Sequence, residues 1–345
     1  MMTEFEAPLI GASNHEDFAE LSRRVRQQGL FLRRRGYYAI KISASVAVLA
    51  ALAVLAAMLG NSWWNLTFAA GIAFVLAQIG FIGHDAGHRQ VWTRRRGNDV
   101  IGVILANLLS GFSFDWWQAK HTRHHAHPNS EGKDPDIAAG ALVYTPAQNG
   151  RRGRFGRRFS RIQQYLLVPL LFLEALNLHV ASMRALARRR DPAALIEIAL
   201  LVVHGGVFFV GPFLILSPVR AAIFILVTQA LFGFYLGASF LTNHVGMPTV
   251  ISSDGVGFLR RQVLTSRNLS GPSFVGFVFG GLDSQIEHHL FPTMPRANLR
   301  RARKVVRPFC AQHGIPYAEH SMWRAYRDVA RHLRTVGSGS PIVVN

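Results

Sequence analysis

Four long apolar runs alternate with polar and basic stretches along the chain. They cover residues 39–59, 66–82, 193–216 and 221–241. Each is close to the roughly 20 residues that a helix needs to cross about 30 Å of hydrocarbon. Because a backbone in lipid must satisfy its own hydrogen bonds, we expect four membrane-spanning helices. Only a short turn separates the two runs of each pair, which predicts two helical hairpins.

Two further apolar stretches, residues 100–114 and 165–180, are shorter or less continuous. Such stretches are typical of interfacial or re-entrant helices that lie against the membrane. If both crossed it, the two chain ends would still lie on one side. The pattern is therefore compatible with four or six crossings, and we favour four.

The distribution of basic residues predicts the orientation of the chain. The 38 lysines and arginines outnumber 19 acids, which gives a net charge of +19. They cluster in residues 23–35, 94–96, 151–161, 184–190 and 296–307. Since cytoplasmic loops carry the excess of positive charge, both ends are expected on the cytoplasmic side of the cell membrane.

The predicted fold is therefore an all-α, multi-pass integral membrane protein with two hairpins and a cytoplasmic helical cap. Residues 1–38 form a cytoplasmic N-terminal segment, and residues 39–345 form the membrane domain. The cap comprises residues 83–190 and 242–345.

Composition excludes several other classes of protein. A nucleic-acid binder can be this basic, but apolar runs of membrane length and 50% hydrophobic residues argue against one. A single cysteine, Cys310, rules out both an intramolecular disulfide and a cysteine metal cage.

Three histidine-rich motifs lie beside the apolar runs. They read H-D-A-G-H at residues 84–88, H-T-R-H-H at residues 121–125 and Q-I-E-H-H at residues 285–289. Residues at i, i+3 and i+4 share a helical face, so each motif can direct several side chains at one point. His244 ends the last apolar run. All of them fall on the predicted cytoplasmic side.

The motifs supply more ligands than one metal ion needs. The candidates are His84, His88, His121, His124, His125, His244, Gln285, His288 and His289. A single zinc ion takes three or four ligands, so the set fits two metal ions with open positions. Its many nitrogens suit iron or copper better than magnesium, calcium or manganese. We expect no catalytic residue beyond this metal centre.

Acidic side chains crowd around these histidines. A metal-bound imidazole commonly donates its second N–H to a neighbouring polar group, which orients the ring. We predict that Asp85, Asn243 and Asp283 support the ligands in this way. His179 and His204 stand alone in apolar stretches and are predicted to be hydrogen-bonded core residues.

The three motifs, in this order and at these intervals, resemble the histidine boxes of the membrane fatty acid desaturases. Residues 285–299, Q-I-E-H-H-L-F-P-T-M-P-R-A-N-L, resemble the acyl-lipid and front-end branch, whose third box opens with Gln. Residues 120–136 are similar to bacterial members. The resemblance covers about residues 35–330.

The resemblance implies a non-haem diiron centre held by the box histidines. It also implies O₂-dependent insertion of a cis double bond into an acyl chain, carried by CoA or by a lipid. The chain has no H-P-G-G haem motif of a fused cytochrome b5. We therefore expect electrons from a separate donor, a ferredoxin or similar protein with its reductase.

Three alternatives are compatible with parts of the pattern. A diiron membrane hydroxylase or ketolase acting on a lipid would share the ligands and differ in its product. A zinc membrane protease needs H-E-x-x-H, but Asp85 replaces the glutamate and Gly87 weakens the helix. A metal transporter would place its ligands near mid-membrane rather than at helix ends.

Overall fold

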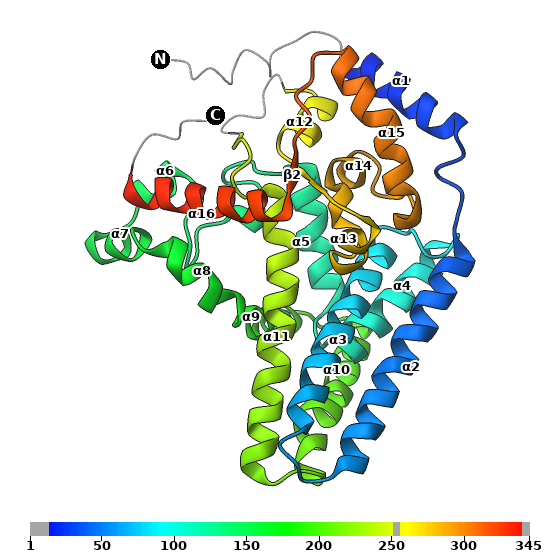
Figure 1. Ribbon diagram of the computed structural model, residues 1–345, viewed down its shortest axis with the longest axis vertical. Helices are drawn as coiled ribbons and strands as arrows, with labels where there is room; N and C mark the ends of the chain where they lie inside the picture. The colour runs from blue at the N-terminus through cyan, green and yellow to red at the C-terminus, as the bar shows by residue number, and fades with distance from the viewer. Residues whose placement is uncertain (1–13, 251–255, 340–345) are drawn as a thin grey trace. The chain divides into compact units, whose positions relative to one another are not determined.

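The computed structural model describes residues 14–250 and 256–339, and most of these are helical (Figure 1). Parts of the predicted N-terminal segment and cap fall outside the described residues. The chain divides into two compact units by its contacts. Unit 1 comprises Met1–Leu32, Lys120–Leu167 and Ser239–Asn345, and unit 2 comprises Arg33–Ala119 and Val168–Ala238.

Four helical segments are long and apolar enough to cross a membrane, as predicted. They are α2 (Arg35–Leu59), α3 (Asn65–Gly87), Pro192–Leu214 and α11 (Pro218–His244). The third consists of α10 (Pro192–Gly205), the π-helix η3 (Gly206–Val210) and the 3₁₀-helix η4 (Gly211–Leu214). Several of the predicted spans were shorter than the helices in the structure. The helices α3 and α11 continue beyond their apolar runs into polar turns that contain His84 and His244.

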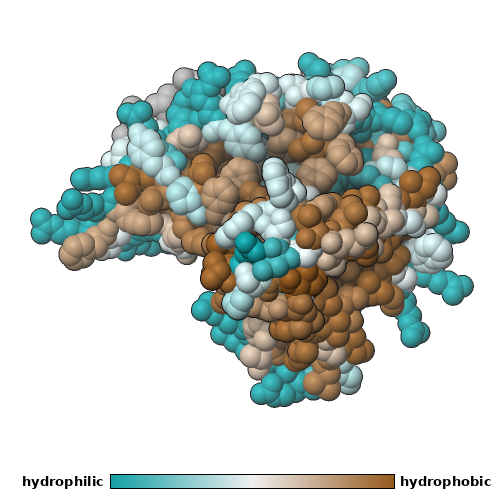
Figure 2. All heavy atoms as spheres, turned by 60° about the horizontal axis from the view of Figure 1, so that its bottom comes forward, coloured by the Kyte–Doolittle hydropathy of each residue, from teal (hydrophilic) through white to brown (hydrophobic). Residues whose placement is uncertain are grey.

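Within unit 2, α3 is the central helix and α2 the peripheral one. Of the most apolar stretch of α3, 67% is buried, against 6% for α2. Ala69, Ala73 and Ala77 recur at every fourth position of α3, and such small side chains allow close helix packing. The exposed side chains of α2 are mostly apolar, as lipid requires, and apolar atoms cover much of the face in Figure 2.

The two shorter apolar stretches form bent helix pairs. The segment Arg95–Ser110, made of α4 (Arg95–Val103) and η1 (Ile104–Ser110), meets α5 (Phe114–Ala126) at 111°. Likewise α8 (Gln163–Leu171) meets α9 (Glu174–Leu186) at 72°. Either pair is a broken span or a re-entrant loop, so the described residues contain four candidate spans, or six if both pairs cross.

Gly111 forms the first bend in unit 2. Its φ of +81° is left-handed, and an added Cβ would lie 2.3 Å from Nε2 of His204. His204 is held in place because its Nδ1 lies 3.1 Å from the carbonyl oxygen of Leu108. Nδ1 of His179 lies 2.6 Å from the carbonyl oxygen of Gly111. Both histidines are hydrogen-bonded, as predicted, but only His204 is a buried core residue, whereas His179 is half-buried.

A buried carboxylate braces the same bend. Glu197 on α10 is almost inaccessible to solvent and accepts hydrogen bonds from Asn107 (3.0 Å), Ser113 (2.7 Å) and Arg189 (2.9 Å). The hydroxyl of Ser113 in turn accepts from the backbone N–H of Trp116, near the start of α5. The first turn of α5 is thereby fixed to α10 within unit 2.

Unit 1 is built around an apolar core between α1 (Asn14–Gln27), α12 (Phe258–Leu264), α14 (Gln285–Leu290) and α15 (Arg296–Gln312). Two short parallel strands, β1 (Asn268–Ser270) and β2 (Glu319–Ser321), pair beside it. The remaining elements are η2 (Pro135–Ile137), α6 (Pro146–Gly150), α7 (Arg154–Ser160), α13 (Ser273–Val278), η5 (Leu282–Ser284) and α16 (Met322–Ser338).

We predict that Gly111→Ala destabilises the protein. The left-handed backbone alone costs a non-glycine residue about 1–3 kcal/mol, and the clash with His204 adds to this. Gly205→Ala is the matched control, because Gly205 is helical and has open space around its Cβ position. The monodisperse fraction that survives heating in detergent should fall for Gly111→Ala and not for Gly205→Ala. If the monodisperse fraction fell equally with temperature for both variants, the bend would tolerate a side chain.

Candidate metal centre

The structure divides the predicted ligands between the two units. Unit 1 holds His121, His124 and His125 at the end of α5, His244 at the end of α11, and Gln285, His288 and His289 on α14. Unit 2 holds His84 and His88 at the end of α3. Seven of the nine candidates can therefore be described together.

Three imidazoles converge inside unit 1. A ring nitrogen of each of His124, His244 and His289 lies within 4.8 Å of the other two. Nε2 of His124 is 3.3 Å from Nε2 of His244. All three side chains are buried. Histidines from three different helices thus face one small volume.

Asp134 orients His124. Both carboxylate oxygens of Asp134 lie 3.0 Å from Nδ1 of His124. The carboxylate also accepts from the backbone N–H groups of Asn129 and Asp136, each at 2.8 Å. Because a carboxylate only accepts, Nδ1 carries the hydrogen and Nε2 presents a lone pair toward His244.

A carbonyl and an amide orient the other two rings. Nδ1 of His244 lies 3.0 Å from the carbonyl oxygen of Thr265. Nδ1 of His289 lies 2.8 Å from Oε1 of Gln262, whose amide nitrogen donates to the carbonyl oxygen of His125. The second bond fixes which end of the Gln262 amide faces His289. Both rings therefore direct Nε2 at the shared volume.

This arrangement suits a bound cation. Burial, and then the neighbouring imidazoles, lower the pKa of His289 well below its usual value, so the ring is neutral at pH 7. Among the described residues, Nε2 of His289 has no hydrogen-bond partner. Buried polar atoms are seldom left unsatisfied. Neutral imidazole nitrogens with free lone pairs are the usual ligands of mid-row transition metals, so these residues fit such an ion.

Gln285 lies beside the same group. Nε2 of its amide is 2.9 Å from Nε2 of His244. Within residues 14–250 and 256–339, its Oε1 has no hydrogen-bond partner. The oxygen and nitrogen of an amide can be interchanged by turning it, which would direct the oxygen at the shared volume. The side chain is nearly inaccessible to solvent.

A second set of rings lies next to the first in unit 1. Nε2 of His121 and Nε2 of His125 are 3.1 Å apart. The ring of His288 lies 4.9 Å from that of His125 and 6.4 Å from that of His121, measured between centroids. The second and third motifs therefore meet in unit 1.

The first motif closes α3 in unit 2. The rings of His84 and His88 lie 4.7 Å apart, and Nδ1 of His84 lies 3.4 Å from Asp85. Trp117 packs against this turn. A Cβ on Gly87 would lie 2.7 Å from the Trp117 ring, which explains the glycine inside the motif.

The structure gives two of the predicted supporting residues other contacts. Asp283 forms a 2.7 Å ion pair with Arg300 on α15. The side-chain oxygen of Asn243 accepts from the hydroxyl of Thr242. The groups that do orient rings in unit 1 include Gln262 and the Thr265 carbonyl, which sequence reasoning missed. A backbone carbonyl leaves no signal in a sequence.

Glu287, inside the third motif, anchors α14. Its buried carboxylate accepts from the Tyr317 hydroxyl (2.6 Å) and from the Asn268 amide (2.8 Å). The oxygen of Asn268 accepts from the backbone N–H of Ile286. Burial raises the pKa of Glu287 above its usual value. The third motif is thereby fixed to β1.

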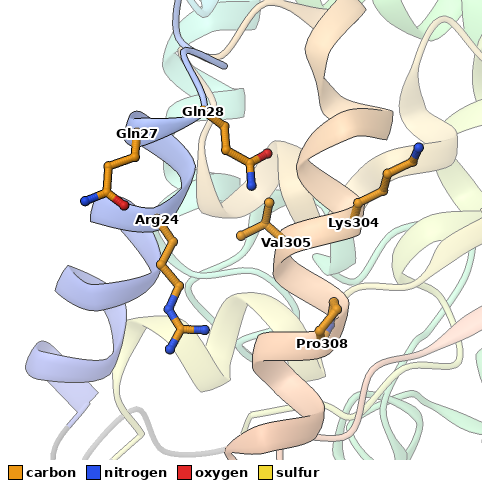
Figure 3. Close-up of a pocket in the computed structure, with 6 residues that line it drawn as sticks. All are labelled: Arg24, Gln27, Gln28, Lys304, Val305 and Pro308. Carbon is orange, nitrogen blue, oxygen red and sulfur yellow. The ribbon is translucent and has the colours of Figure 1, made fainter.

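A hollow of about 370 Å³ lies between α1 and α15 (Figure 3). Its lining includes Arg24 and Lys304, and Figure 3 shows Lys304 extending away from α1. Arg24 already pairs with Glu20 and bonds Gln312. No candidate ligand lines the hollow, so it is separate from the metal centre.

Known proteins show similarity over most of the chain. The family described as fatty acid desaturase matches residues 61–321. An acyl-lipid (9-3)-desaturase of Physcomitrium patens is 31% identical over 94% of this chain and 63% of its own length. The delta(6)-fatty-acid desaturase fat-3 of Caenorhabditis elegans is 29% identical over 92% of this chain and 76% of its own length. The chain thus spans under two thirds of the length of the Physcomitrium patens protein.

We predict that Asp134→Asn weakens metal binding about 10- to 100-fold, the usual cost of losing a group that orients a ligand. The amide can present N–H to His124 and so allow the other ring tautomer. Asp99→Asn is the control, because Asp99 pairs only with Arg95 at the surface among the described residues. Metal retained after dialysis against graded chelator, measured by mass spectrometry, would distinguish them. Equal metal retention by the two variants would show that Asp134 does not orient a ligand.

Proposed function

The chain belongs to the fatty acid desaturase family, and we propose that it is an O₂-dependent desaturase that inserts a cis double bond into a fatty acyl chain. The acyl group is carried by CoA or by a lipid. The observation that carries the proposal is the buried set of His124, His244 and His289, each directing Nε2 at one volume. A related diiron hydroxylase or ketolase is the alternative.

The proposed cofactor is a pair of non-haem irons. In unit 1 the ligands are His121, His124, His125, His244, Gln285, His288 and His289. The sequence adds His84 and His88 to this proposed set. Such irons would supply O₂ activation and removal of two hydrogens from an unactivated methylene pair.

The protein's own contribution is rigidity and the exclusion of water. Asp134, Gln262 and the Thr265 carbonyl hold three rings in one tautomer. Glu287 and Asn268 hold the helix that carries His288 and His289. Ligands that are fixed beforehand need little reorganisation during the reaction. Their burial keeps solvent from the reacting groups.

Electron supply is proposed to come from a separate ferredoxin or similar donor with its reductase. One cysteine, Cys310, cannot form a four-cysteine iron–sulfur cluster. We also propose that the enzyme lies in the cell membrane with its metal centre and both ends on the cytoplasmic side. The basic stretches listed in the sequence support this orientation through the positive-inside rule.

Purified protein supplied with acyl substrate, O₂ and a reduced donor should release an acyl product that lacks two hydrogens. His289→Ala should abolish the product because it removes a buried nitrogen that no neighbour replaces. His313→Ala, a histidine outside the motifs at the end of α15, should retain activity. Mass spectrometry of the acyl chains is the readout. A hydroxylated product would favour the alternative, and full activity of His289→Ala would refute both.

Gln285 offers a finer test of the ligand set. Gln285→His restores a nitrogen at the same place and should keep part of the turnover. Gln285→Ala removes the polar group and should lose most of it. The same acyl-chain assay measures both variants, with protein amounts matched by size-exclusion chromatography. If both turn over at the wild-type rate, Gln285 is not part of the centre.

A further inference from the structure

In unit 1, the segment from α7 to the start of α8 has polar side chains buried and apolar side chains exposed. Ser160 at the end of α7 and Gln163 at the start of α8 are inaccessible to solvent. The Gln163 amide bonds the backbone of Val143 and the carbonyl oxygen of Leu333. The Ser160 hydroxyl accepts from Arg152. The buried polar groups of this segment thus have hydrogen-bond partners inside the protein.

The outward face is aromatic and aliphatic. Phe155 and Phe159 are four residues apart on α7, which places them on one helical face, and Ile162 follows in the turn between α7 and α8. They are 89%, 41% and 48% exposed, and Phe155 is the most exposed large apolar side chain among the described residues. Single exposed apolar residues are common, but a stripe of them marks an interaction surface.

Positive charge surrounds this stripe. Arg154 precedes Phe155, Arg157 and Arg158 lie between Phe155 and Phe159, and all three arginines are exposed. No acidic residue occurs between Asp136 and Glu174 in the sequence. At the left edge of Figure 2, where α7 lies, hydrophilic and hydrophobic atoms stand side by side. The surface is therefore both apolar and cationic.

Two features favour a lipid surface over a protein as the occupant. A basic helix with an apolar aromatic face is typical of segments that lie in a membrane interface. In addition, α7 leads directly into α8, the first half of a bent pair that is apolar enough to enter a membrane. Clustered arginines at such a surface attract anionic headgroups.

We propose that α7 lies in the interface of an anionic bilayer, with Phe155, Phe159 and Ile162 among the upper acyl chains and its arginines at lipid phosphates. The contact is independent of the proposed chemistry. It assigns the exposed side chains of residues 154–162 a lipid-binding role that the metal centre does not require.

The experiment measures the depth of Phe155 in lipid nanodiscs. Cys310→Ala removes the single cysteine, and Phe155→Cys is then labelled with a polarity-sensitive dye in the full-length protein. Discs contain phosphatidylcholine alone or with phosphatidylglycerol, and some carry a nitroxide on the acyl chain. Ala311→Cys, exposed at the end of α15, is the matched control label.

The expected result is blue-shifted emission and nitroxide quenching at residue 155, both stronger in anionic discs than in neutral ones. Replacing Arg154, Arg157 and Arg158 with Gln should reduce the quenching in anionic discs to the neutral level. The control label should respond to neither change. Because the substituted side chains are exposed, size-exclusion profiles should remain those of the wild type.

Water-like emission at residue 155 in both kinds of disc would overturn the proposal. So would quenching that is equal in neutral and anionic discs and unaffected by the arginine substitutions. A shift that appears only when an acidic protein is added would identify a protein-binding surface instead.

Discussion

Buried imidazole nitrogens that face one another repel unless a cation lies between them, and the described part of unit 1 is arranged around this constraint. His124 and His244 bring their Nε2 atoms to 3.3 Å, with His289 beside them. Removing such groups from water without a partner is costly. A cation in the volume between the rings would remove this repulsion and give Nε2 of His289 a partner.

The rest of unit 1 supports these rings in successive layers. Asp134 and Gln262 fix the ring tautomers, and backbone N–H groups fix Asp134 in turn. Behind α14, Asn268 binds both Ile286 and Glu287. Substituting any one of these residues should disturb the rings through the next layer, because buried polar networks lose more than one bond when a member is lost.

The apolar pattern predicted the candidate spans, and the histidine spacing predicted helical motifs, because both are local properties of a sequence. Hydrophobic runs identify helices that cross lipid, and an i, i+3, i+4 spacing identifies one helical face. The predicted positions of the helix ends were less accurate. His84 and His244 belong to spans whose last turns are polar, so the apolar run ends before the helix does.

The partners of buried polar groups were the least predictable, because they come from distant parts of the chain. Asp283 was expected to support a ligand, but α15 brings Arg300 to it. Glu197 lies in an apolar run and gave no signal, yet it accepts bonds from three side chains in unit 2. The carbonyl of Thr265 orients His244 through a backbone atom that every residue possesses.

The central claim is that buried imidazoles hold a pair of iron ions. Metal analysis of protein purified from cells grown in a mixture of iron, zinc, copper and manganese tests it directly, with X-ray absorption at the edge of the bound metal. The account predicts two irons per chain in a shell dominated by nitrogen ligands. Stoichiometric zinc, or protein that binds no transition metal while remaining folded, would contradict it.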